Sequence, residues 1–155
     1  LHKGLVPQEP HNVLSGLRTY GPDRQVSKSD TEQRNIAALK AFGLAGDRYD
    51  IDAMMALMTE DCVFESSFGP EAHGTRYEGQ DQVRESLQWF LDRFSGGKWT
   101  NPEHFVIGDR GVAEWTFTGT DPDGSSVEVN GCDVITFRDG QIAFKDSYRK
   151  NRTTI

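Results

Sequence analysis

The sequence GCDVITFRDGQIAFKDSYRK, residues 131–150, predicts two paired β-strands joined by a tight turn. Asp139-Gly140 is a strong hairpin signal, and the runs on both sides are rich in β-forming residues. A two-residue loop at Asp139-Gly140 sets the register of the hairpin. Counting outward from that loop makes Asp133 and Asp146 direct neighbours across the two strands.

The predicted pair of aspartates would lie in apolar surroundings. Strand side chains alternate between faces, so Asp133 and Asp146 would share one with Ile135, Phe137, Ile142, Phe144 and Tyr148. Two like charges opposite each other on such a face are costly. One carboxyl would therefore keep its proton. A carboxylic acid beside a carboxylate suits general acid–base catalysis.

Two alternatives to this acid pair stay open. Asp133 could lie near the end of the sheet, where water solvates it, while Asp146 pairs with Arg149 or Lys150. A one-residue bulge in either strand would also separate the pair, because it would place the two carboxyls on opposite faces.

Composition limits the classes of protein that need to be considered. A length of 155 residues predicts one domain. The net charge of −7 argues against nucleic acid or an anionic membrane as the main partner. The chain has no run of 18 apolar residues and no signal-peptide pattern, so we expect a soluble, cytoplasmic protein. It also lacks a glycine-rich phosphate loop and any His/Cys cluster with ligand spacing, so we expect neither a metal nor a cofactor.

The predicted helices lie in the first two thirds of the chain. Residues 1–30 hold half of the prolines and predict an N-terminal arm ahead of a domain at 31–152. Ser29 and Glu32 have capping-box spacing for a helix that Gly46 would end. A short helix from about residue 50 carries the three methionines. These methionines, Met58 among them, either fill the core or form an adaptable pocket wall.

The rest of the chain completes an α+β domain. A third helix at 80–94 would bury a stripe that includes Phe90. Strands are expected at 61–68, where Phe64 and Ser66 share a face, and at 99–107, 112–120, 125–137 and 141–149. A strongly bent antiparallel sheet wrapped around three helices would form a cone open at one end. Ligands favour such mouths, and we expect an apolar small molecule there.

A second hairpin extends the predicted register. If Thr120 faces Ser125, then Glu114 becomes a third acid on the face of Asp133. The same counting places His104 on the other face, opposite Trp115. His104 is then either an acid–base group of a pocket or a hydrogen-bonded packing residue. Tyr148 either donates its hydroxyl into the cavity or closes the end of the sheet.

Several local strings resemble the nuclear transport factor two-like superfamily, which includes ketosteroid isomerase and the SnoaL-like polyketide cyclases. These strings are Ala45-Gly46-Asp47, Met58–Glu65, Tyr77-Glu78-Gly79, Thr118-Gly119-Thr120, Phe137–Ile142 and Lys145–Tyr148. The resemblance covers about 31–152. It implies the cone fold and a homodimer formed through the outer face of the sheet, where we expect Trp115, Phe117 and Cys132. It does not specify a reaction, because this fold hosts many chemistries.

Individual positions distinguish the subfamilies. Ketosteroid isomerase has three catalytic positions. By the resemblance, two of them fall on Ser66 and Leu39, and only the third, the oxyanion-binding acid, is retained, as Asp133. Limonene-epoxide hydrolase has an aspartate where Asp146 stands, but its Arg-x-Asp motif falls on Glu114-Trp115-Thr116. The histidine of scytalone dehydratase resembles His104. In the SnoaL-like cyclases the base resembles Asp133 or Asp146.

Together these observations predict a cofactor-independent enzyme of the isomerase, cyclase or dehydratase type. Asp146 would be the base and Asp133, protonated, would donate a hydrogen bond to a developing enolate. His104, Glu114 and Tyr148 would support them, and Ser66, Phe64, Met58 and Phe90 would line the ligand site. The alternatives are a non-catalytic module that binds a ligand or dimerises, and an epoxide hydrolase.

Overall fold

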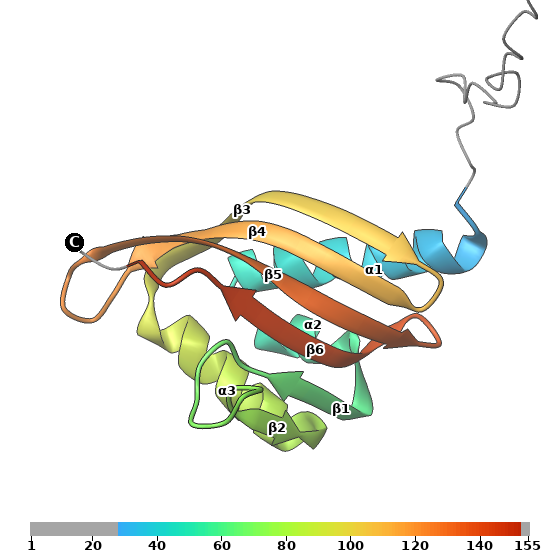
Figure 1. Ribbon diagram of the computed structural model, residues 1–155, viewed down its shortest axis with the longest axis horizontal. Helices are drawn as coiled ribbons and strands as arrows, with labels where there is room; N and C mark the ends of the chain where they lie inside the picture. Colours follow the sequence, from blue (N-terminus) through green and yellow to red (C-terminus); the bar gives the residue numbers. More distant parts are fainter. Residues whose placement is uncertain (1–27, 153–155) are drawn as a thin grey trace, which may run out of the picture.

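The computed structural model describes residues 28–152 and contains three helices and six strands (Figure 1). The predicted arm at 1–30 therefore lies almost entirely outside the described residues. In chain order the elements are α1 (Asp30–Asp47), α2 (Ile51–Ala56), β1 (Met58–Glu65), β2 (Arg76–Glu78), α3 (Gly79–Arg93), β3 (Ser95–Ile107), β4 (Arg110–Thr120), β5 (Ser126–Arg138) and β6 (Gln141–Arg149).

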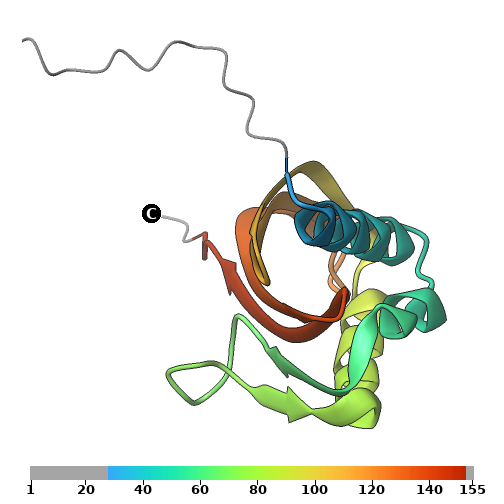
Figure 2. The ribbon, with the colours of Figure 1, turned by 90° about the vertical axis from the view of Figure 1, so that its right-hand side faces the viewer.

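The six strands form one bent sheet in the order β2-β1-β6-β5-β4-β3. Neighbouring strands are antiparallel except β1 and β6, which run parallel. The sheet curls so that the helices lie on its concave side (Figure 2). The predicted α+β cone is thus confirmed, and the short strand β2 is an addition to it. Within 28–152 no helix is long and apolar enough to cross a membrane.

The start of α1 follows the prediction, and its end does not. Ser29 Oγ accepts a hydrogen bond from the Glu32 backbone N–H, and Glu32 Oε2 accepts one from that of Ser29, which completes the capping box. Gly46 was expected to end α1, but the helix continues to Asp47. Gly46 is instead buried against the ring of Trp99, where a Cβ atom would fit only tightly.

A bulge changes the predicted register of the β5–β6 hairpin. Phe137 pairs with Ile142 as expected, but the next pair is Thr136 with Phe144, so Ala143 is an extra residue in β6. The predicted pairing of Asp133 with Asp146 is therefore wrong. Asp133 pairs with Ser147, and Asp146 lies on the opposite, convex face of the sheet.

The β4–β5 hairpin is also shifted by one residue. The Asp121 carboxylate accepts hydrogen bonds from the backbone N–H groups of Asp123 and Ser125, which keeps Ser125 in the loop. Thr120 then pairs with Ser126, and Ala113 pairs with Asp133. As a result, the predictions for Glu114 and for the two outer aromatics are wrong: Trp115 and Phe117 face the interior and Glu114 faces outward.

Hydrophobic side chains from the helices and the concave face of the sheet form the core. Met54, Met55 and Met58 are all buried in it. This agrees with the packing interpretation for Met55 and Met58, whereas Met54 also borders an interior cavity. Phe117 is 2% exposed and packs against the rings of Phe90 and Trp99. Trp89, on the far side of α3, is half exposed.

Glu32 also joins α1 to the β3–β4 turn, because its Oε1 accepts a hydrogen bond from the Gly108 N–H at 3.0 Å. This bond, together with that from Ser29, lowers the pKa of Glu32 below its usual value of 4.5. A carboxyl group whose pKa is lowered on folding stabilises the folded state at pH values above its usual pKa. This stabilisation is lost as the pH falls through the folded-state pKa.

Replacing Glu32 by Gln should therefore lower the melting temperature at pH 7, and the difference from the wild type should shrink as the pH falls below the usual pKa of 4.5. Thermal unfolding followed by circular dichroism at several pH values measures this difference. Glu85→Gln, which changes an exposed residue on α3, is the control. A Glu32→Gln difference that does not vary with pH would contradict the assignment.

Candidate functional site

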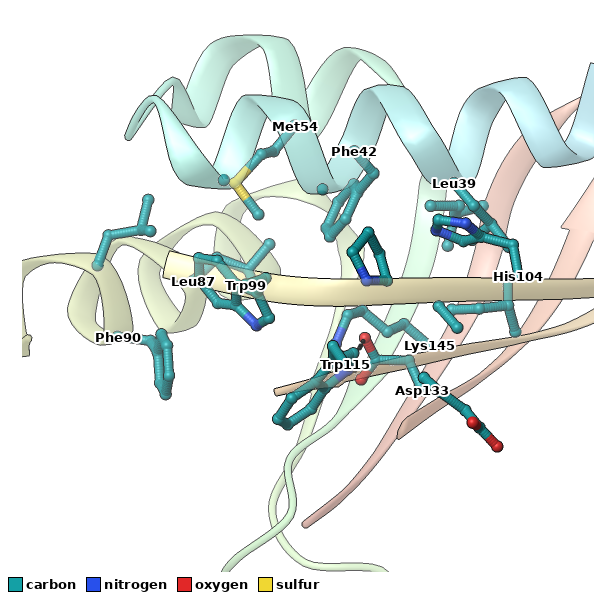
Figure 3. A pocket seen from close by; sticks show the side chains of 18 residues that line it. Leu39, Phe42, Met54, Leu87, Phe90, Trp99, His104, Trp115, Asp133 and Lys145 are labelled. Atoms are coloured by element: carbon teal, nitrogen blue, oxygen red, sulfur yellow. Dashed lines mark hydrogen bonds and ion pairs between the residues drawn. The ribbon is translucent and has the colours of Figure 1, made fainter. Parts of the chain in front are cut away.

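Two adjoining chambers occupy the concave side of the sheet. In each, the centre of a water molecule can lie anywhere within a volume of about 80 Å³. One water needs roughly 10–15 Å³ by this measure, so each chamber can hold a group larger than a single water. Both chambers are lined mainly by hydrophobic and aromatic side chains, and Figure 3 shows the first. The residues that they share are Leu87, Phe90, Trp99, Trp115, Asp133 and Lys145.

Asp133 is the acidic group at the boundary between the chambers. Its Oδ1 accepts hydrogen bonds from Lys145 Nζ at 2.8 Å and from Ser147 Oγ at 2.6 Å. Its Oδ2 accepts one from Trp115 Nε1 at 3.1 Å. The Asp133 and Lys145 side chains are only 12% and 9% exposed. Three donors thus fix the orientation of a buried carboxylate, and one of them carries a compensating positive charge.

Local sequence explains how these groups meet. The bulge at Ala143 turns Lys145 and Ser147 to the concave face beside Asp133. Trp115 pairs with Gly131, and a side chain at Gly131 would collide with the indole ring. The missing side chain therefore lets the indole lie close to β5, with its N–H directed at Asp133.

His104 lines the first chamber (Figure 3). It pairs with Ala113 on β4, which in turn pairs with Asp133 on β5. The prediction that His104 lies on the face opposite Asp133 is therefore wrong, because the register shift turns it inward. Burial, and then the positive charge of Lys40, lower the pKa of His104 below its usual value of 6.5. Its imidazole is consequently neutral at pH 7.

The ligand-site residues predicted from the sequence divide into two groups. Phe64, Ser66 and Phe90 line the chambers. Met58 is buried in the core and lines neither chamber, so the packing alternative applies to it. Ser66 Oγ is also engaged within its own loop, where it donates to the Phe68 carbonyl oxygen.

Asp146 and Tyr148 lie on the convex face of the sheet. Tyr148 is 54% exposed and its hydroxyl donates to Asp146 Oδ2 at 2.7 Å. This hydrogen bond is the main cause of a raised Tyr148 pKa. Glu114 borders the first chamber, but it is exposed and alternates with the inward-facing Ala113 and Trp115. None of these three acidic or phenolic groups joins Asp133 in the interior, because both hairpin registers are shifted.

Lys145, Ser147 and Trp115 were not predicted as neighbours of Asp133. The predicted register placed Lys145 and Ser147 on the face opposite Asp133, and Trp115 on the outer face of the sheet. Gly131 within the predicted strand is a signal that could have been noticed, since a glycine inside a strand often marks a close approach. In the described part of the chain, no group of three or more His, Cys, Asp or Glu residues is arranged to hold a metal ion.

Replacing Lys145 by Met should destabilise the protein by about 3–5 kcal/mol, because it leaves the Asp133 carboxylate buried without its cation. The double variant Asp133→Asn/Lys145→Met should be destabilised by less than the sum of the two single variants. Urea unfolding of the four proteins measures this coupling. Additive single effects would show that the two groups do not interact.

Comparisons with known proteins agree with this fold. The model of the SnoaL-like domain family matches residues 37–144. A search of curated proteins finds no match. Among solved structures, a candidate polyketide cyclase from Xanthomonas campestris is 26% identical, with a TM-score of 0.69 and coverage of 78% of this chain and 93% of that chain.

Two further solved structures have similar folds. A protein of unknown function from Mesorhizobium loti, described as NTF2-like, is 25% identical with a TM-score of 0.67, and the match covers 81% of this chain and 98% of that chain. A candidate isomerase from Bacillus subtilis is 21% identical with a TM-score of 0.69 and coverage of 79% and 90%. The family match spans more than half of the sequence. The chain therefore belongs to the SnoaL-like domain family of the nuclear transport factor two-like superfamily.

Proposed function

We propose that the protein is a cofactor-independent enzyme that transfers protons on an apolar, cyclic, carbonyl-bearing small molecule. The reaction would be an isomerisation, a cyclisation or a dehydration. The observation that carries the proposal is the Asp133 carboxylate, which is buried and fixed by three donors in a largely apolar cavity. A fixed carboxylate in such surroundings is suited to removing a proton from carbon.

In the proposed mechanism Asp133 is the base. Its Oδ2 accepts one hydrogen bond, from Trp115, and so keeps a lone pair for a proton next to a substrate carbonyl. When Asp133 becomes neutral, the Lys145 ammonium loses its negative partner and favours the negative charge that develops on the substrate. The role of base, which the sequence analysis gave to Asp146, thus passes to Asp133.

His104 would be the second acid–base group. It lies two strands away from Asp133 in the same row of the sheet. At about 4.8 Å between neighbouring strands, the two Cα atoms are roughly 10 Å apart, which leaves room for a ring between the side chains. A neutral imidazole can donate its N–H to an enolate oxygen, and its other ring nitrogen can accept a proton.

The relatives support an enzyme of this general kind. One solved structure at 26% identity is described as a candidate polyketide cyclase. The epoxide-hydrolase alternative loses support, because Asp146 and Glu114 both lie outside the interior. A non-catalytic ligand-binding module is the second candidate. The observation that favours it is that both Asp133 oxygens already accept hydrogen bonds within the protein.

Replacing Asp133 by Asn should lower catalysis by about a hundredfold or more, because Asn cannot act as the base. The matched control is Asp146→Asn, which makes the same change on the convex face and should retain wild-type activity. A suitable readout is the exchange of hydrogen for deuterium at the α-carbon of a panel of cyclic ketones, followed by NMR in heavy water.

The two proposed functions differ in this assay. If the wild type accelerates exchange and Asp133→Asn does not, Asp133 is the base. Equal activity of Asp133→Asn and the wild type would overturn the mechanism. Binding of ketones without exchange in any variant would instead favour the binding module.

We also propose that the protein is a homodimer, as the resemblance implied, with β3 contributing to the interface. Phe105 and Ile107 on the convex side of this strand are 54% and 82% exposed, which is unfavourable in water. Phe105→Glu/Ile107→Glu should therefore convert a dimer to a monomer in sedimentation velocity experiments at micromolar concentration. A wild-type monomer would refute the proposal.

A further inference from the structure

The second chamber differs from the first in its charge. Both chambers share the Asp133–Lys145 pair, whose charges cancel. The second chamber is also lined by Arg149 and by several serines. Arg149 follows Lys145 and Ser147 in alternation along β6, and it therefore points to the concave face. Within residues 28–152 no carboxylate forms an ion pair with Arg149.

Arg149 also lies at the junction between this chamber and an open groove on the surface. Among residues 28–152, only Arg149 and Val129 line both the chamber and the groove. The groove contains four basic residues, Arg93, Arg149, Lys150 and Arg152, against the two acids Asp121 and Glu128. This positive excess stands out in a chain whose net charge is −7, and it would attract anions to the entrance of the chamber.

Aromatic rings help to orient the guanidinium groups near this entrance. Arg149 Cζ lies 5.9 Å from the centre of the Phe68 ring, and Arg93 Cζ lies 5.3 Å from that of Trp89. Phe68 and Trp89 also contact each other, with ring centres 6.0 Å apart. A guanidinium group placed over a ring keeps its N–H edge available for a planar anion such as a carboxylate.

We infer that the small molecule bound in the interior carries an anionic group, such as a carboxylate, which Arg149 binds at the entrance of the second chamber. This inference rests on the proposed function in taking the two chambers as the ligand site. The apolar body of the ligand would extend past Phe90 and Trp99 towards the first chamber. Its anionic end would form a two-point hydrogen bond with the Arg149 guanidinium.

Two fluorescent probes with the same ring system can test this inference. Anilinonaphthalenesulfonate carries an anionic group, and phenylnaphthylamine is the neutral molecule without it. Arg149→Gln should weaken binding of the sulfonate about tenfold, which corresponds to about 1.4 kcal/mol, and should leave the affinity for the neutral probe unchanged. Fluorescence titration measures both dissociation constants.

Lys150→Gln is the matched control, because it removes the same charge from an exposed neighbour in the groove. It should change the affinity for the sulfonate by less than about twofold. Equal weakening in the Lys150→Gln and Arg149→Gln variants would overturn the inference, because it would indicate general attraction by charge. An equal effect of Arg149→Gln on both probes would overturn it as well.

A second variant guards against misfolding of Arg149→Gln. Arg149→Lys keeps the charge but loses the two-point geometry, and its affinity for the sulfonate should fall between those of the wild type and Arg149→Gln. Circular dichroism checks that each variant is folded. Neither probe reacts, so this result is independent of the exchange assay on Asp133→Asn, and either proposal can fail without the other.

Discussion

The extra residue Ala143 is the constraint on which the interior of this protein depends. It shifts the alternation of β6, so that Lys145, Ser147 and Arg149 face the concave side and Asp146 the convex side. Without it, two like charges would lie opposite each other in an apolar cavity. With it, Asp133 faces a cation. The bulge thus replaces a repulsive pair by an attractive one, and it provides both the cation beside the buried carboxylate and the arginine of the second chamber.

Much of the fold follows from local patterns in the sequence. The capping box at Ser29, the Asp139-Gly140 turn and the run of strands in the second half are all short-range signals, and the structure confirms them. The two hairpin registers were harder to predict. Both faces of β6 contain apolar and charged residues, so alternation alone does not locate Ala143. The loop after Thr120 is one residue longer than predicted, because Ser125 belongs to it. The Asp121 carboxylate accepts a hydrogen bond from the backbone N–H of Ser125.

The candidate site shows the same division between local and long-range information. Asp133 was predicted to face the interior because its strand is apolar. That prediction does not require knowing which groups donate hydrogen bonds to Asp133. The donors around it come from β4 and β6, and a one-residue error in either strand exchanges them for outward-facing groups. The family resemblance could not correct this error, because it matched Asp133 and Asp146 equally well. The direction of each side chain had to come from the structure.

The parallel pairing of β1 with β6 has a consequence for folding. It joins Met58 to Ile142 and Glu65 to Asp146, across most of the described chain, whereas the other strand pairs connect segments closer in sequence. Contacts between distant segments form slowly, because the intervening chain has to be ordered first. The second chamber takes Phe64 from β1 and Lys145 from β6, so it is complete only when these two distant segments are together. A molecule that fills the chamber would therefore bind only while these two strands are together, and it would stabilise the protein against unfolding.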